Sequence, residues 1–121
     1  TGTGTYTNYS VDGKGTGSAQ VAETLATGAI NVTSAANVLE NVKLTGFNAD
    51  DKITFTGVTQ AVFNAAVSFS SNNAGDVTIS YVDGASSATL NKIVLAGVSV
   101  GADVVDLTSF NALAVGDIFF G

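Results

Sequence analysis

Short stretches in which apolar and polar residues alternate run through most of this chain. Clusters of Gly, Asn, Asp and Ser, which favour turns, separate these stretches at intervals of roughly ten residues. Alternation with period two is typical of strands that bury one face, whereas a helix needs a period of 3.6. The pattern therefore predicts an all-β fold, a single β-sandwich or β-roll domain of short strands. Strands are expected over residues 3–11, 29–33, 38–44, 52–56, 67–70, 77–82, 89–95 and 118–120.

Two short segments have a helical pattern instead. Ser18 is a suitable N-cap for a helix over residues 19–26, and Thr59 is a suitable cap for one over residues 60–66. The sequence shows no convincing internal repeat. We expect an extended Gly/Thr-rich strand at residues 1–17, able to act as a donor strand, followed by one β domain at residues 18–121.

The composition argues against most kinds of chemistry. The chain has neither Cys nor His, so it lacks thiol nucleophiles, zinc thiolates and the usual general base. Ten acidic residues against four basic ones give a net charge of −6, which repels nucleic acid. No apolar run is long enough to span a bilayer as a helix. Since no catalytic motif appears either, we expect a protein that is not an enzyme and that binds neither nucleic acid nor a small-molecule substrate.

Residues 44–55, L-T-G-F-N-A-D-D-K-I-T-F, resemble the element that closes the calcium-binding repeat region of bacterial type I secreted (RTX-like) proteins. The family follows this element with a hairpin, an L-x-G-V step and an acid before bulky apolar residues. Residues 95–98 and 117–120 match the last two features in the same order. The family's Gly-Gly-x-Gly-x-Asp-x-apolar-x nonapeptide does not occur in this chain. The resemblance implies a bacterial protein that is extracellular or on the cell surface, with calcium as a possible cofactor.

Two acidic segments are the candidate calcium sites. Asp50 and Asp51 lie in the turn of the matched element, where Asn48 can add an oxygen ligand. Asp103 and Asp106 form a second candidate. The alternative is that these residues are ordinary solvated turn residues, chosen because their side chains hydrogen-bond nearby backbone groups.

The two ends of the chain are the candidate assembly segments. The first ten residues are rich in Gly and Thr and lack Pro, so they need a partner strand to become ordered. That partner is either an edge strand of the same domain or an edge strand of a neighbouring copy. Ile118, Phe119 and Phe120 either fill the domain's own core or plug a groove in a neighbour. The residues assigned to assembly are Thr3, Thr5, Tyr6, Tyr9, Ile118, Phe119 and Phe120.

Together these features predict a secreted bacterial structural protein that self-assembles into an extracellular fibre or surface layer by β-strand addition. Its partner would be further copies of the same chain. The alternative is a C-terminal export and calcium-binding module of a larger type I secreted adhesin or hydrolase. Glycine-aspartate nonapeptides encoded upstream of this segment would favour the alternative.

Overall fold

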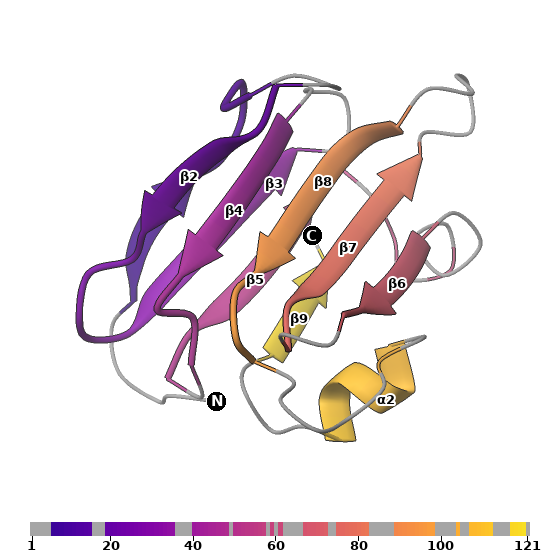
Figure 1. The fold of residues 1–121 in the computed structure, drawn as a ribbon. Coiled ribbons are helices and arrows are strands. Elements are labelled where there is room, and N and C mark those ends of the chain that lie inside the picture. Colours follow the sequence, from indigo (N-terminus) through magenta and orange to yellow (C-terminus); the bar gives the residue numbers. More distant parts are fainter. Residues whose placement is uncertain are drawn as a thin grey trace.

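In the computed structural model of the chain, most of the regular elements that can be described are strands (Figure 1). The structure describes residues 6–15, 19–35, 40–48, 50–57, 59, 61, 67–72, 75–82, 89–98, 104, 107–112 and 117–120, with the backbone alone at 82, 89, 90, 107, 111 and 117–120. The elements are β1 (Thr7–Ser10), β2 (Val21–Thr24), β3 (Ile30–Ala35), β4 (Glu40–Thr45), β5 (Lys52–Thr56), β6 (Val67–Ser71), β7 (Val77–Val82), β8 (Thr89–Leu95), α2 (Leu107–Ala112) and β9 (Asp117–Phe120). The all-β fold class is confirmed.

The strands form two sheets, and from β1 to β5 the chain passes from one sheet to the other at every connection. Sheet A has the order β1-β3-β5-β9, and sheet B has the order β2-β4-β8-β7-β6. All neighbours in sheet A are parallel, as are β2, β4 and β8 in sheet B. We call one passage of the chain through both sheets a coil. Thr7 lies opposite Ile30 and Val21 lies opposite Val42, so each coil takes a little over twenty residues. We call this arrangement the roll.

An antiparallel segment interrupts the roll and the roll then resumes. After β5 the chain forms β6 and β7, which pair antiparallel with each other, and β7 pairs antiparallel with β8. β8 takes the place beside β4, and β9 then takes the place beside β5. The strands β2, β4, β8 and β7 lie side by side in the front layer of Figure 1, with β3, β5 and β9 behind them.

The inner faces of both sheets contribute to one buried core. Strand β3 alternates buried and partly exposed residues along its whole length, as period two predicts. Val32 lies opposite Ile53 in sheet A, Leu44 lies opposite Leu95 in sheet B, and all four are fully buried. Burying each such side chain contributes about 1.5–3 kcal/mol. The core cluster consists of Val11, Leu25, Ile30, Val32, Val42, Leu44, Phe47, Ile53, Phe55, Phe69, Val77, Ile79, Tyr81, Ile93, Leu95, Val104 and Phe110.

The helix predicted over residues 19–26 is wrong, because Val21–Thr24 forms strand β2. These residues pair in parallel register with β4, so backbone pairing in the roll overrides a weak local preference for helix. The helix predicted over residues 60–66 falls, apart from Ala61, outside the described residues. The sequence also failed to predict α2, whose Phe110 is fully buried with its ring centroid 6.0 Å from that of Phe69 in β6.

Candidate assembly edge

Both sheets end in a short strand at the same end of the roll. β1 is the end strand of sheet A and β2 is the end strand of sheet B. The Thr7 and Val11 amides donate to carbonyls of the β3 segment, so the intervening Asn8 and Ser10 direct their backbone groups away from β3. By the same alternation, the bond from Leu25 N–H to the β4 segment leaves the Ala22 and Thr24 backbone groups directed away from β4. Along the described residues, this outer backbone has no partner strand.

A tyrosine–glutamate pair joins the two end strands. The Tyr9 hydroxyl in β1 donates to Glu23 Oε1 in β2 at 2.9 Å. Tyr9 lies opposite the buried Val32, and Glu23 lies opposite the buried Leu44, so both occupy inward-facing positions. Burial, the hydrogen bond to Glu23 and its negative charge together raise the pKa of Tyr9 to about 12. The pair therefore replaces, at the end of the roll, the apolar contacts that fill its interior.

Two further contacts hold this end in place. The Lys14 ammonium lies over the Tyr9 ring, 5.4 Å from its centroid. The backbone of the loop that carries Lys14 is tied to the next coil, because the Asn41 amide donates to the Lys14 carbonyl at 2.8 Å. Gly15, with φ of +74°, packs so closely on the Asn41 carbonyl that a Cβ atom would overlap it. The first coil is therefore fixed to the second without closing off its outer edge.

A polar ladder runs along the outer face of sheet A and ends at this edge. Thr54 Oγ1 donates to Asn31 Oδ1 at 2.7 Å, and Asn31 Nδ2 donates to Asn8 Oδ1 at 3.0 Å. Asn8 and Asn31 lie directly opposite each other in the parallel register. Asn8 is exposed and is the last member of the ladder. Its side-chain amide is therefore placed to hydrogen-bond a polar side chain of a strand added beside β1.

The residues assigned to assembly lie at opposite ends of sheet A rather than together. Tyr9 is in β1, whereas the backbone of Ile118–Phe120 forms most of β9, the strand at the other end. Tyr6 precedes β1, and the Lys52 ammonium lies 4.4 Å from the centroid of its ring. Of the two alternatives for the amino-terminal segment, the structure shows pairing within the chain for Thr7–Ser10. Thr3 and Thr5, and the side chains of Ile118, Phe119 and Phe120, lie outside the described part.

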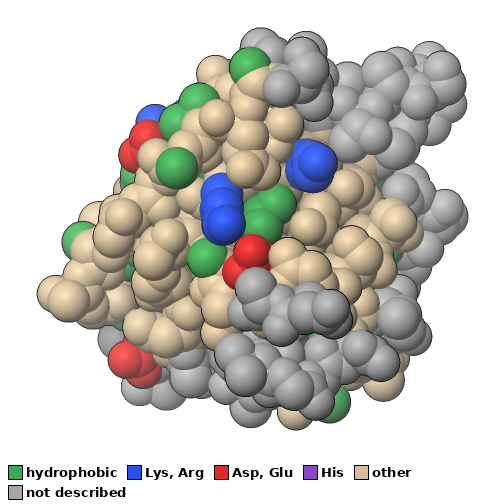
Figure 2. Space-filling model, in the orientation of Figure 1, with side chains coloured by type: hydrophobic (Ala, Val, Ile, Leu, Met, Phe, Trp, Pro, Cys, Tyr) green, Lys and Arg blue, Asp and Glu red, His purple; other side chains and the backbone are tan. Residues whose placement is uncertain are grey.

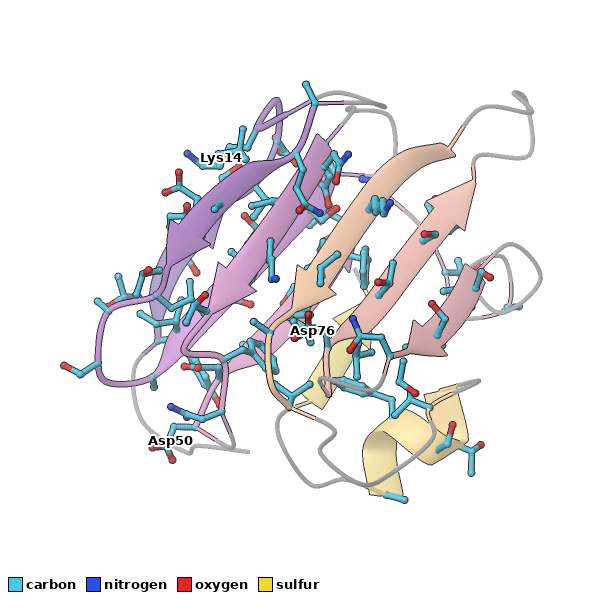
Figure 3. All side chains as sticks on the ribbon, viewed as in Figure 1. Lys14, Asp50 and Asp76 are labelled. Atoms are coloured by element: carbon cyan, nitrogen blue, oxygen red, sulfur yellow. The ribbon has the colours of Figure 1, made fainter. Side chains whose placement is uncertain are left out.

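The turn proposed as a calcium site brings Asn48, Asp50 and Asp51 together, but the Asp51 carboxylate accepts hydrogen bonds from backbone N–H groups. Asp51 is fully buried, and its two carboxylate oxygens accept from Ile30 N–H at 2.9 Å and Asn48 N–H at 3.0 Å. Asn48 Oδ1 accepts from Asp50 N–H at 2.9 Å, and Asp50 itself is exposed at the lower rim of the roll (Figure 3). This is the local hydrogen bonding of a structural turn, the second of the two alternatives.

The other predicted calcium ligands, Asp103 and Asp106, lie outside the described residues. Within the part of the chain that the structure describes, no three acidic side chains come close enough to hold a metal ion together. Asp50 and the carbonyl oxygens of its turn remain the donors that would contact calcium from solvent, since hard cations take carboxylate and carbonyl oxygens.

Two more aspartates join neighbouring segments in the way that Asp51 does. Asp12 Oδ1 accepts from Ala35 N–H at 2.8 Å, across the first two coils. Asp76 Oδ1 accepts from Gly97 N–H at 2.9 Å, and this bond is the main cause that lowers the pKa of Asp76 (Figure 3). Lys43 lies 3.5 Å from the other Asp76 oxygen. Sequence patterns miss this role because each bond joins residues more than twenty positions apart.

A buried polar cluster, also missed from the sequence, lies between the sheets. Ser34 in β3, Glu40 in β4 and Asn91 in β8 are each at most 2% exposed. Ser34 Oγ lies 2.9 Å from both Glu40 carboxyl oxygens, and Asn91 Nδ2 donates to Ser34 Oγ at 2.9 Å. Burial raises the pKa of Glu40 to about 8, although the hydrogen bonds from Ser34 and Asn91 oppose this rise.

Comparisons with protein families, curated proteins and solved structures found no match to this chain. Among the described residues, no helix is long and apolar enough to cross a membrane. The geometry of the roll and its open edge therefore carries the functional argument.

Proposed function

We propose that this chain is a secreted bacterial structural protein that self-assembles into an extracellular fibre or surface layer by β-strand addition. The observation that carries the proposal is the end of the roll formed by β1 and β2. There, both sheets stop at a short strand whose outer backbone groups have no partner strand among the described residues. Such an edge is a template for pairing with another chain.

The direction of the strands favours a fibre over a closed pair. Every neighbouring pair in sheet A is parallel, with β1 at one end and β9 at the other. A copy that places its β1 beside the β9 of the next copy continues the same parallel order. That contact joins two different surfaces, so it repeats from copy to copy and the assembly propagates unless its rotation closes a ring.

The edge lacks two of the features that usually block strand addition, Lys and Pro, although its strands are short and Glu23 faces inward. The described residues of β1 and β2 include neither Lys nor Pro, and the one charged side chain, Glu23, is hydrogen-bonded to Tyr9. Exposed residues there are mostly small or uncharged: Thr7, Asn8, Ser10, Ala22 and Thr24. On the face of sheet B turned to the viewer in Figure 2, uncharged side chains also predominate, with few lysine or acidic groups among them.

The alternative function also has a specific observation in its favour. Calcium-binding nonapeptide repeats of type I secreted proteins wind into parallel β-helices. The first five strands of this chain follow the same kind of parallel, sheet-to-sheet winding. In a larger secreted adhesin or hydrolase, a preceding coil would occupy the edge of β1 and β2, and this segment would serve export and bind calcium at Asp50.

Proline at outward-facing backbone positions tests the proposal. The double variant Ser10→Pro/Ala22→Pro removes two outward N–H groups and leaves the hydrogen bonds to β3 and β4 intact. The control Ser10→Ala/Ala22→Ser changes the same positions and keeps both N–H groups. We expect the wild type and the control to form fibres by electron microscopy and light scattering, and the proline variant to stay folded and monomeric.

Two outcomes would contradict assembly at this edge. One is a proline variant that forms fibres as readily as the control. The other is a wild type that stays monodisperse at high concentration, with or without calcium. If that monomer binds calcium in a calorimetric titration, the export and calcium-binding module becomes the better explanation.

A further inference from the structure

We propose that Ser34, Glu40 and Asn91 form a proton-dependent latch, which holds the two sheets together while Glu40 is protonated and weakens when Glu40 ionises. The cluster is independent of the assembly edge and of any calcium ion. It lies where β3 of sheet A passes into β4 of sheet B, so it acts on the contact between the sheets.

The latch spans three strands. Ser34 is the fifth residue of β3, Glu40 is the first residue of β4, and Asn91 lies directly opposite Glu40 in β8. Besides its bond to Ser34, Asn91 Nδ2 donates to the Ala35 carbonyl at 3.1 Å. The side chains therefore connect sheet A to two neighbouring strands of sheet B, in a region where 2% or less of each side chain is exposed to water.

Counting hydrogens shows why a proton completes the cluster. Ser34 Oγ is 2.9 Å from both Glu40 oxygens but has one hydrogen to donate. A protonated Glu40 accepts that hydrogen on one oxygen and donates its own hydrogen back to Ser34 Oγ from the other. An ionised Glu40 has no hydrogen to donate, so one close oxygen pair lacks a bond and a negative charge is left in a water-poor site.

The charged groups around Glu40 do not relieve this penalty. Asp12, on the connection between β1 and β2, acts on Glu40 with a like charge, which opposes ionisation. Lys14, on the same connection, directs its ammonium over the Tyr9 ring. Lys92 follows the buried Asn91 in β8 and is partly exposed, as expected for the other face of the strand.

The pH range of the latch follows from burial. Burial raises the pKa of Glu40 to about 8, compared with 4.5 for an ordinary glutamate. Because the folded state then holds the proton more tightly than the unfolded state, the contribution of Glu40 to stability is full below about pH 4.5 and is lost as pH rises to about 8. Within that window the unfolding equilibrium constant rises about tenfold per pH unit. The chain has neither His nor Cys, so the side chains that ordinarily titrate in the upper part of that window are absent.

The first measurement is a direct titration. The chain has two glutamates, Glu23 and Glu40, so a sample labelled with ¹³C-glutamate gives two side-chain carboxyl signals. The variant Glu40→Gln removes the Glu40 signal, which identifies it in the wild type, and the remaining signal is that of Glu23. We expect the Glu40 signal of the wild type to titrate near pH 8. A midpoint in the ordinary range of a carboxylic acid overturns the latch.

The second measurement compares unfolding in denaturant from pH 5 to pH 9 for the wild type, Glu40→Gln and the control Glu23→Gln. We expect the wild type and the control to lose stability as pH rises, and Glu40→Gln to stay level and to exceed the wild type at pH 9. Curves of equal slope for all three proteins overturn the latch. If Glu40→Gln does not fold, the labelled wild type, with its second signal assigned by Glu23→Gln, still decides the matter.

Discussion

The buried carboxylate of Asp51 should contribute more to stability than any other acidic group of its turn. It accepts two backbone hydrogen bonds, one from Asn48 in its own turn and one from Ile30 at the start of β3. Asp51→Ala leaves both N–H groups without that acceptor. A hydrogen bond to a charged group contributes about 1.5–3 kcal/mol, so for two such bonds we expect a loss of about 3–6 kcal/mol. Against a total stability of about 5–15 kcal/mol, this is a large effect.

Urea unfolding followed by circular dichroism measures this effect, and Asp50→Ala is the matched control because Asp50 is exposed. We expect the control to stay within about 0.5 kcal/mol of the wild type. Asp51→Asn keeps one acceptor oxygen, so its loss should fall between those of Asp50→Ala and Asp51→Ala. If Asp51→Ala and Asp50→Ala unfold at the same urea concentration, the argument that Asp51 holds the coils together is refuted.

Two further predictions concern the turns. Gly13→Ala should cost about 1–2 kcal/mol because it places a side chain at a φ of +75° in open space. Gly15 has nearly the same φ, but the side chain of Gly15→Ala would also overlap a backbone carbonyl, so this variant should lose about 1–3 kcal/mol more stability than Gly13→Ala. Equal thermal midpoints for the two variants would contradict that packing. Calcium bound at Asp50 should raise the free energy of unfolding by mass action, by about 2.7 kcal/mol at a hundredfold excess over its dissociation constant, and so raise the thermal midpoint. No heat and no shift in midpoint at millimolar calcium would leave Asp50 as an ordinary turn residue.

The sequence predicted individual strands well because alternation is a local pattern. The bounds predicted for residues 52–56, 77–82 and 89–95 agree with β5, β7 and β8. The winding of the chain was predicted only as far as the two alternatives of a β-sandwich and a β-roll. Some positions that face each other carry the same residue, such as Val21 and Val42, but others, such as Glu23 and Leu44, differ in character. The connections between coils also differ in length, so the coils leave no clear repeat in the sequence.

The candidate site was predicted in part. Tyr9 was recognised as part of an end strand, but its partner Glu23 was not, because the predicted helix over residues 19–26 hid β2. Glu40 gave no signal, since a single acid beside apolar residues fits either a surface or a buried position. The burial of Asp51 depends on its bond to Ile30, and a local pattern cannot show a contact between residues so far apart.

Fibre diffraction tests the central claim most directly. If copies stack end to end, with β1 of one beside β9 of the next, sheet A runs along the fibre and its strands lie across it. Aligned assemblies should then give the strand spacing of about 4.7–4.9 Å along the fibre axis. The same spacing at right angles to the axis, or the absence of any assembly, would contradict strand addition at the edge of β1 and β2.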